Sequence, residues 1–156
     1  MRPSPASPPP GLFLREEALM RGAELVLRAE RALADVTAAP CLEAGLGRAH
    51  QRVLLVIACN PGLSVSDLQH LLRIRKQSLG RVLDALVARG LVVRQRDSRD
   101  RRRHLLKLTA AGNELERTLF AAMRERIAAA YRHAGPDQVS GFWNVLAVLA
   151  GDGDSG

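Results

Sequence analysis

The sequence predicts a mainly α-helical fold that contains one small β-hairpin. Apolar residues recur at three- and four-residue spacings over most of the chain, and two short β-like runs flank a charged loop. Hydrophobic residues make up 47% of the chain but aromatic residues only 3%, so the core is expected to consist mainly of Leu, Val and Ala. A length of 156 residues suits a single domain.

Two helices are expected first. Apolar residues keep a helical spacing over residues 12–37, and the stretch that contains Pro40 is expected to break this helix. A second helix is expected over residues 48–59. With these bounds Cys41 lies in a loop, whereas Cys59 continues an apolar run and is interpreted as a core residue.

Two shorter helices follow. Ser64 and Asp67 stand three residues apart, a spacing typical of a capping box at the start of a helix. After a short connection near Ile74, an apolar stripe predicts another helix from Lys76 that ends at Gly90.

The hairpin and the last two helices complete the chain. Residues 91–95 and 104–109 have the composition of strands and enclose the charged loop. Thr109 is expected to cap a long helix over residues 110–133, and a last helix is expected over residues 137–150.

The resulting order, α-α-α-α-β-β-α-α, is that of a winged helix-turn-helix with N- and C-terminal dimerisation helices. The apolar stripes of the terminal helices are longer than a small winged core can cover, which predicts a homodimer. The expected organisation is a disordered Pro-rich tail (1–11), one domain (12–150) and a disordered tail (151–156). Within the domain the winged part covers about 48–109, and the dimerisation helices about 12–37 and 110–150.

The charge indicates a polyanionic partner. The formal net charge is +7 and the isoelectric point about 10.9, values that favour nucleic acid or an acidic membrane surface. The longest apolar run, VLLVIAC, is too short to span a bilayer, and the N-terminus lacks the apolar segment of a secretory signal. The two cysteines have no metal-binding or CxxC spacing. We therefore expect a reduced cytoplasmic protein without membrane, metal or cofactor.

The helix that begins at Lys76 has the pattern of a recognition helix. Its apolar stripe faces inward, which leaves polar residues of its first turns free for base edges and phosphates. Gln77 can pair with adenine, and Arg81 with guanine or a phosphate. Ser78 suits a phosphate oxygen, and the helix N-terminus attracts anions. The candidate DNA contacts are Arg75, Lys76, Gln77, Ser78 and Arg81. The alternative is that any amphipathic helix has a polar first turn.

The loop between the two strands is rich in arginine. A hairpin tip beside a recognition helix can enter the minor groove, where arginine is favoured. Arg102 is the expected minor-groove residue, and Arg99 and Arg101 are expected on phosphates. Asp100 is expected to brace the turn by accepting backbone hydrogen bonds and pairing with a nearby loop arginine. The alternatives are a plain turn-forming aspartate and a charged run that is merely solvated.

Other candidate sites carry weaker signals. Cys41 could sense oxidants, and His50 with Arg52 could line a ligand pocket, although ordinary core, surface or interface roles are the alternatives. The histidines have no metal-site spacing. No catalytic triad order, phosphate-binding glycine loop or paired carboxylates stand out, so no enzyme activity and no catalytic residue are expected.

The stretch DSRDRRRHLLKLTAAG resembles the wing signature of the MarR family of bacterial regulators, a D-x-R element followed by an L-T-x-x-G helix start. The matching residues are Asp100, Arg102, Leu108, Thr109 and Gly112. The order of the flanking elements is similar too, so the resemblance covers about residues 14–150. It implies a homodimer with intertwined terminal helices that binds a pseudo-palindromic operator, commonly as a repressor released by a small ligand or oxidant.

The chain departs from this family at Arg75, where Ser or Thr usually caps the recognition helix. This change weakens the cap by ~1 kcal/mol but can add a phosphate contact. The expected function is that of a sequence-specific double-stranded DNA-binding transcriptional regulator. The main alternative is a winged-helix dimeric protein-interaction module, although a module of that kind has no need for two basic elements. An enzyme acting on DNA would need a carboxylate cluster, which the sequence lacks.

Overall fold

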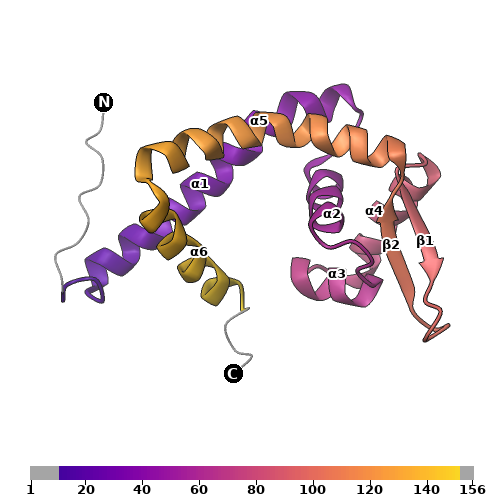
Figure 1. Ribbon diagram of the computed structural model, residues 1–156, viewed down its shortest axis with the longest axis horizontal. Coiled ribbons are helices and arrows are strands. Elements are labelled where there is room, and N and C mark those ends of the chain that lie inside the picture. The colour runs from indigo at the N-terminus through magenta and orange to yellow at the C-terminus, as the bar shows by residue number, and fades with distance from the viewer. Residues whose placement is uncertain (1–10, 152–156) are drawn as a thin grey trace. The chain divides into compact units, whose positions relative to one another are not determined.

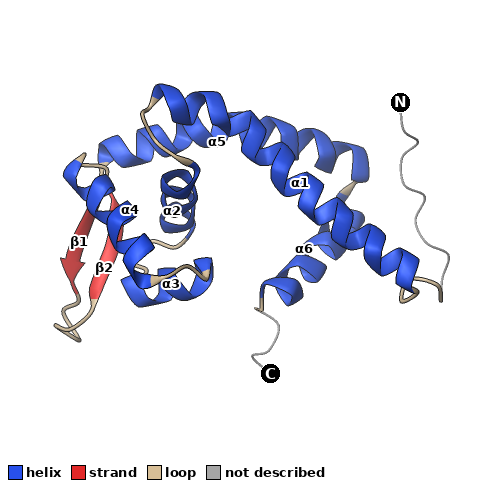
Figure 2. Ribbon diagram, turned by 180° about the vertical axis from the view of Figure 1, so that it is seen from behind, coloured by secondary structure: helices blue, strands red, loops and turns tan. Residues whose placement is uncertain are grey.

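The computed structural model describes residues 11–151, and it confirms a mainly helical chain with one hairpin (Figures 1 and 2). The predicted terminal tails lie outside the described residues, apart from Gly11 and Gly151. The contacts divide the chain into two compact units, of which the first ends at Val36 and the second begins at Thr37. The elements are α1 (Glu16–Glu43), α2 (Arg48–Cys59), α3 (Val65–Leu72), α4 (Lys76–Ala88), β1 (Val92–Arg96), β2 (His104–Leu108), α5 (Ala110–Ala134) and α6 (Pro136–Ala150).

The predicted bounds of α1 were wrong at both ends. The helix begins at Glu16 instead of Leu12, and it continues through Pro40 to Glu43. Proline disrupts a helix because it has no amide hydrogen and crowds the preceding turn. Here it precedes only one further turn, and that turn is held from outside the helix. Arg89 donates hydrogen bonds to the carbonyl oxygens of Ala44 (2.5 Å) and Gly45 (2.9 Å), just beyond the helix end.

The core of the second unit is built from leucine and valine stripes, as the composition predicted. The side chains that are at most 1% exposed come from α2, α3, α4, both strands and α5: Val53, Leu54, Ile57, Leu68, Leu79, Leu83, Leu86, Val92, Leu106 and Leu119. Cys59 was wrongly predicted to join this core and is exposed. It follows Ile57 by two residues, which turns it about 200° around the helix, away from the buried face.

The helix-turn-helix consists of α3 and α4. The predicted capping box is confirmed, since the Ser64 hydroxyl accepts from the Asp67 amide at 3.1 Å. The connection contains Arg73 in the left-handed conformation, with φ of 49°. Within the described chain the Arg75 side chain makes no capping hydrogen bond to α4. The start of α4 therefore keeps amides without a side-chain cap, as expected from the departure at this position.

The hairpin pairs β1 with β2 antiparallel, and Val92 lies opposite Leu108. It is also tied to the segment before α3. The Leu106 amide donates to the Leu63 carbonyl oxygen (2.8 Å), and the Gly62 amide donates to the Leu106 carbonyl oxygen (3.2 Å). These bonds attach the middle of β2 to the segment that leads into α3, so the wing is tied to the helix-turn-helix.

Candidate nucleic-acid interface

The first half of α4 presents a polar surface. All five residues predicted there to contact DNA are exposed, namely Arg75, Lys76, Gln77, Ser78 and Arg81. Leu79, Leu83 and Leu86 on the opposite face are buried, each at most 1% exposed. The buried stripe anchors the helix and leaves these polar residues accessible to a partner, which is the arrangement that reading a groove requires.

The tip of the wing is organised by its two aspartates. An oxygen of Asp97 accepts from the Arg99 amide (2.9 Å), and an oxygen of Asp100 accepts from the Arg102 amide (3.0 Å). Two backbone bonds close the tip, from the Asp97 amide to the Arg103 carbonyl oxygen (3.0 Å) and from the Arg103 amide to the Asp100 carbonyl oxygen (2.9 Å). Both carboxylates thus make the backbone contacts expected of a brace. The side chains of Arg99, Arg101 and Arg102 remain exposed.

Two arginines of the wing form ion pairs outside it. Arg94 Nη2 lies 2.7 Å from Asp84 Oδ1 of α4, and Arg103 Nη2 lies 3.1 Å from Asp67 Oδ2 of α3. The sequence analysis had expected the loop's arginines to pair with the loop's own aspartates. Nothing in the sequence marks these partners, because Asp67 precedes Arg103 by 36 residues and only the fold brings them together.

A groove of about 460 Å³ lies between the helix-turn-helix and the wing, and its walls carry several basic side chains. Of the predicted DNA contacts, Lys76 and Arg102 line it, while Gln77, Ser78 and Arg81 lie outside its lining. The rest of the lining was not among the predicted DNA contacts and consists of Ser64, Val65, Ser66, Gln69, Leu79, Gly80, Leu83, Arg94, Arg103 and His104. A basic groove of this kind suits a phosphate backbone.

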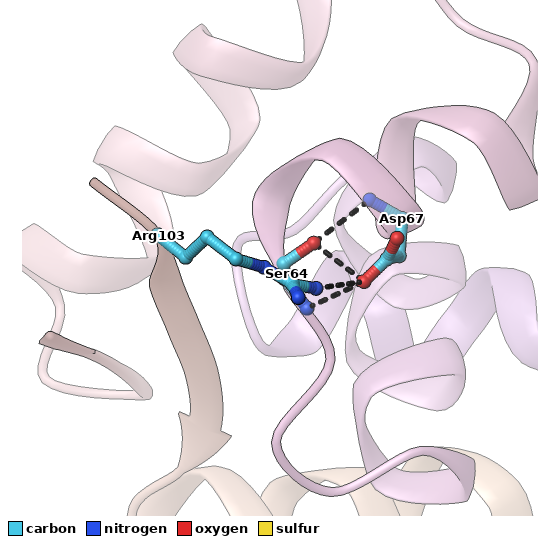
Figure 3. A network of polar contacts seen from close by, with 3 residues as sticks. All are labelled: Ser64, Asp67 and Arg103. Atoms are coloured by element: carbon cyan, nitrogen blue, oxygen red, sulfur yellow. Dashed lines mark hydrogen bonds and ion pairs between the residues drawn. The ribbon is translucent and has the colours of Figure 1, made fainter. Parts of the chain in front are cut away.

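One carboxylate oxygen joins α3 to the wing, as Figure 3 shows. Asp67 Oδ2 accepts from the Ser64 hydroxyl (2.5 Å), from the Arg103 guanidinium (3.1 Å) and, at longer range, from the Ser64 amide (3.4 Å). The hydrogen bonds from Ser64, with the Arg103 charge as a smaller cause, lower the pKa of the Asp67 carboxyl. Asp67 is therefore a stable anion beside the groove.

Of the three residues predicted for a ligand pocket or sensor, Cys41 has other surroundings than expected. Cys41 lies in the last turn of α1 instead of a loop, and it is only 6% exposed. Burial raises the pKa of the Cys41 thiol, which disfavours the reactive thiolate. His50 Nδ1 accepts a hydrogen bond from the Gly47 amide at 3.2 Å and so caps the start of α2. Arg52 is exposed.

Across residues 11–151, none of the helices combines the length and the apolarity needed to cross a membrane. The same part of the chain holds no group of three or more His, Cys, Asp or Glu residues that could bind a metal ion.

Comparison with known proteins identifies the family. The chain is 42% identical over 138 residues to the HTH-type transcriptional regulator PetP of Rhodobacter capsulatus, an alignment that covers 88% of this chain and 83% of PetP. A model described as the MarR family matches residues 44–103, from the end of α1 to the wing. The chain belongs to the MarR family. It is thus a DNA-binding transcriptional regulator of the winged helix-turn-helix type.

Further relatives support this assignment. The regulator FarR of Neisseria gonorrhoeae is 34% identical over 99 residues, covering 64% of this chain and 68% of FarR. The crystal structure of NadR in complex with 4-hydroxyphenylacetate has a TM-score of 0.75 and 27% identity, covering 94% of this chain and 98% of that one. A MarR-family regulator from Silicibacter pomeroyi shares the fold, with a TM-score of 0.73 and 24% identity over 86% of this chain and 91% of that one.

Proposed function

We propose that this MarR-family chain is a cytoplasmic repressor that binds a pseudo-palindromic operator as a homodimer and is released by a small carboxylate ligand. The observation that carries the proposal is the pair of exposed basic elements beside one groove. Lys76 of α4 and Arg102 of the wing line the same groove. In this proposal α4 reads the major groove, while Arg102 enters the adjacent minor groove.

The polar residues of α4 are assigned by their chemistry. Gln77 and Arg81 read base edges, and Ser78 and Lys76 bind phosphate oxygens. Arg75 adds a phosphate contact beside the uncapped amides that begin α4. On the wing, Arg99 and Arg101 neutralise phosphates while Asp100 holds the backbone of Arg102 in place.

Support for a homodimer comes from α6. Its exposed apolar side chains are Phe142 (48% exposed), Trp143 (59%), Val145 (59%), Val148 (68%) and Leu149 (64%). An apolar face of this size on one helix is typical of a surface that a partner covers. The Trp143 indole donates to the Tyr131 hydroxyl at 2.7 Å, which fixes the orientation of α6 on α5. A second copy of the chain is the proposed cover, because two-fold symmetry then places two winged motifs on two half-sites.

For the release step we favour a small ligand over an oxidant. NadR was crystallised with 4-hydroxyphenylacetate, a small aromatic carboxylate. Cys41, the sensor thiol favoured by the sequence, is buried with a raised pKa, so it is poorly suited to react with an oxidant. Cys59 is exposed, but it ends α2, where the helix dipole disfavours a thiolate. The proposed effector is therefore a small carboxylate that lowers the affinity for DNA.

The decisive experiment is selection of bound duplexes from a random library with the purified protein. An enriched palindrome with half-sites about one helical turn apart supports the proposal. If no duplex is enriched, the alternative of a protein-interaction module is favoured. With the selected duplex, fluorescence anisotropy should show that Arg102→Ala weakens binding at least tenfold, whereas the exposed α5 residue Arg126, changed to Ala, has little effect.

Three further measurements test the finer claims. If about six phosphates are neutralised, log affinity falls with log salt with a slope of about −5. Sedimentation should find a dimer, and Val148→Asp should produce monomers while Ser140→Asp, on an exposed position of the same helix, does not. Titration with 4-hydroxyphenylacetate and related carboxylates should release the duplex; if none of them does, the ligand assignment fails.

A further inference from the structure

Arg103 differs from the other arginines at the wing tip in having a defined ionic partner on another element. Its guanidinium pairs with Asp67 at 3.1 Å, and Asp67 belongs to the capping box of α3. The contact crosses from the return side of the hairpin to the first helix of the helix-turn-helix (Figure 3). Arg99, Arg101 and Arg102 are exposed at the tip itself.

We propose that Arg103 is a positioning residue, which holds the wing against the N-terminal end of α3 and thereby sets where Arg102 lies relative to α4. It acts through Asp67 and makes no contact with DNA of its own in this role. The inference rests on the proposed function, since it explains how the wing and α4 are held in a fixed position relative to each other for DNA binding.

The backbone explains why such a contact is needed. The bonds between Leu106 and Leu63 and the bridge between Ser64 and Leu105 attach β2 to the chain before α3. Strand pairing ends at Arg96 and His104, so beyond this pair the tip projects as a loop from a two-stranded ribbon, which alone is only marginally stable. The Arg103–Asp67 pair lies at this boundary, so it acts where the angle of the projecting tip is decided.

The electrostatics point the same way. Asp67 is an anion next to Ser66, which lines the basic groove. If it were unpaired, it would repel an incoming phosphate. Arg103 is 50% exposed and Asp67 52% exposed, so the pair by itself stabilises the fold only weakly. Its main effect is therefore expected in DNA binding, where small displacements of Arg102 change a contact inside a narrow groove.

Asp67→Asn separates positioning from direct contact, because the two roles predict opposite results. If Arg103 bound phosphate directly, removal of the nearby carboxylate would free its guanidinium and tighten binding. If Arg103 positions the wing, the same change weakens binding. The expected loss of affinity is about fivefold for each copy of the chain on the duplex, which is the upper range for the loss of an exposed ion pair. Asparagine keeps a carbonyl oxygen that can still accept from Ser64, so the cap of α3 is largely preserved.

The experiment measures the affinity of the full-length wild type, Asp67→Asn, Arg103→Gln and the double variant for the selected duplex. Positioning predicts that the double variant is no weaker than Arg103→Gln, because both changes break one contact. Glu114→Gln is the control, since it removes the same charge and breaks an exposed pair with Arg117 on α5. It should leave the affinity unchanged.

A second readout reports on the minor groove alone. Replacing adenine by 2,6-diaminopurine in the outer flanks of the duplex adds an amino group to the minor groove. The wild type should lose affinity on this substitution. The flank ratio, defined as the affinity for the unsubstituted duplex divided by the affinity for the substituted one, should fall towards one in both Asp67→Asn and Arg103→Gln. Thermal unfolding should show that both variants stay folded at the assay temperature.

The outcomes are distinct. Equal or tighter binding by Asp67→Asn, or a wild-type flank ratio in Arg103→Gln, overturns the positioning role while leaving the proposed function standing. Absence of duplex binding by the wild type itself overturns both. Weaker binding by both single variants, non-additive in the double variant and with a reduced flank ratio, supports the inference.

Discussion

Gly112 of α5 lies directly against the carbonyl group of Leu91, the residue before β1. A methyl group built on Gly112 would overlap the Leu91 carbonyl oxygen and crowd its carbonyl and α carbons. The same carbonyl accepts a hydrogen bond from the Thr109 amide at 3.1 Å. The start of α5 is therefore packed onto the backbone that leads into the wing, and the L-T-x-x-G sequence has a steric explanation.

Gly112→Ala should destabilise the protein by about 1–3 kcal/mol, because the obstacle is a backbone carbonyl that cannot move without displacing the hairpin. Denaturant unfolding followed by circular dichroism measures the change. Gly141→Ala is the matched control: Gly141 also lies in a helix, and its added methyl group meets no atom within 4 Å. The control should be neutral or stabilising by up to about 1 kcal/mol, and equal losses in the two variants would refute the steric explanation.

Thr109→Val should cost roughly 1–2 kcal/mol in the free energy of unfolding. The Thr109 hydroxyl accepts from the Gly112 amide (2.9 Å) and donates to the Gly90 carbonyl oxygen (2.7 Å), so it caps α5 and fixes the turn after α4 together. Thr109→Ser keeps the hydroxyl and should retain most of the stability. A serine variant as unstable as the valine variant would show that the methyl group matters more than the cap.

Arg89→Gln should lower the midpoint of thermal unfolding by several degrees. The guanidinium donates to the carbonyl oxygens of Ala44 and Gly45, just past the end of α1, and it holds the turn that follows Pro40. A cation at the C-terminal end of a helix also interacts favourably with the helix dipole. Arg124→Gln, on an exposed position of α5, serves as the control for the lost charge. The explanation fails if both variants shift the midpoint equally.

The stability contributed by Asp67 should depend on pH. Hydrogen bonds from Ser64 and the Arg103 charge lower the pKa of the folded Asp67 carboxyl below its ordinary value of 3.8. A lowered pKa stabilises the folded state above the unfolded pKa, and this stabilisation is lost as the pH falls through the folded pKa. The difference in unfolding free energy between the wild type and Asp67→Asn should thus be constant at neutral pH and shrink below about pH 4. If the difference in unfolding free energy stayed constant down to pH 2, the lowered pKa of Asp67 would be contradicted.

The two cysteines should react very differently with iodoacetamide. Cys59 is exposed, whereas Cys41 is buried and its pKa is raised, so little thiolate is present near neutral pH. Peptide mass spectrometry should find Cys59 modified within minutes and Cys41 protected until denaturant is added. Rapid modification of Cys41 in the folded protein would reopen its role as a redox sensor.

Most helix bounds could be predicted because their signals are local. The predicted range of α2 agrees with the observed one at both ends. The helices α3 and α5 begin directly after Ser64 and Thr109, which were predicted to cap them. Capping and helical periodicity depend on residues within about one or two turns, so a single sequence contains them. The end of α1 was missed because the helix continues through Pro40, and the carbonyl oxygens just past its end are bound by Arg89, a residue far along the chain.

For the candidate interface, the sequence by itself determined which elements carry positive charge and which face of α4 is polar. The tertiary structure decided what those charges do. It gave Arg94 and Arg103 partners on α4 and α3, and it put Lys76 and Arg102 on one groove. The physical reason is range: helix faces and caps follow from neighbouring residues, whereas an ion pair across 36 residues exists only once the hairpin has folded back onto α3.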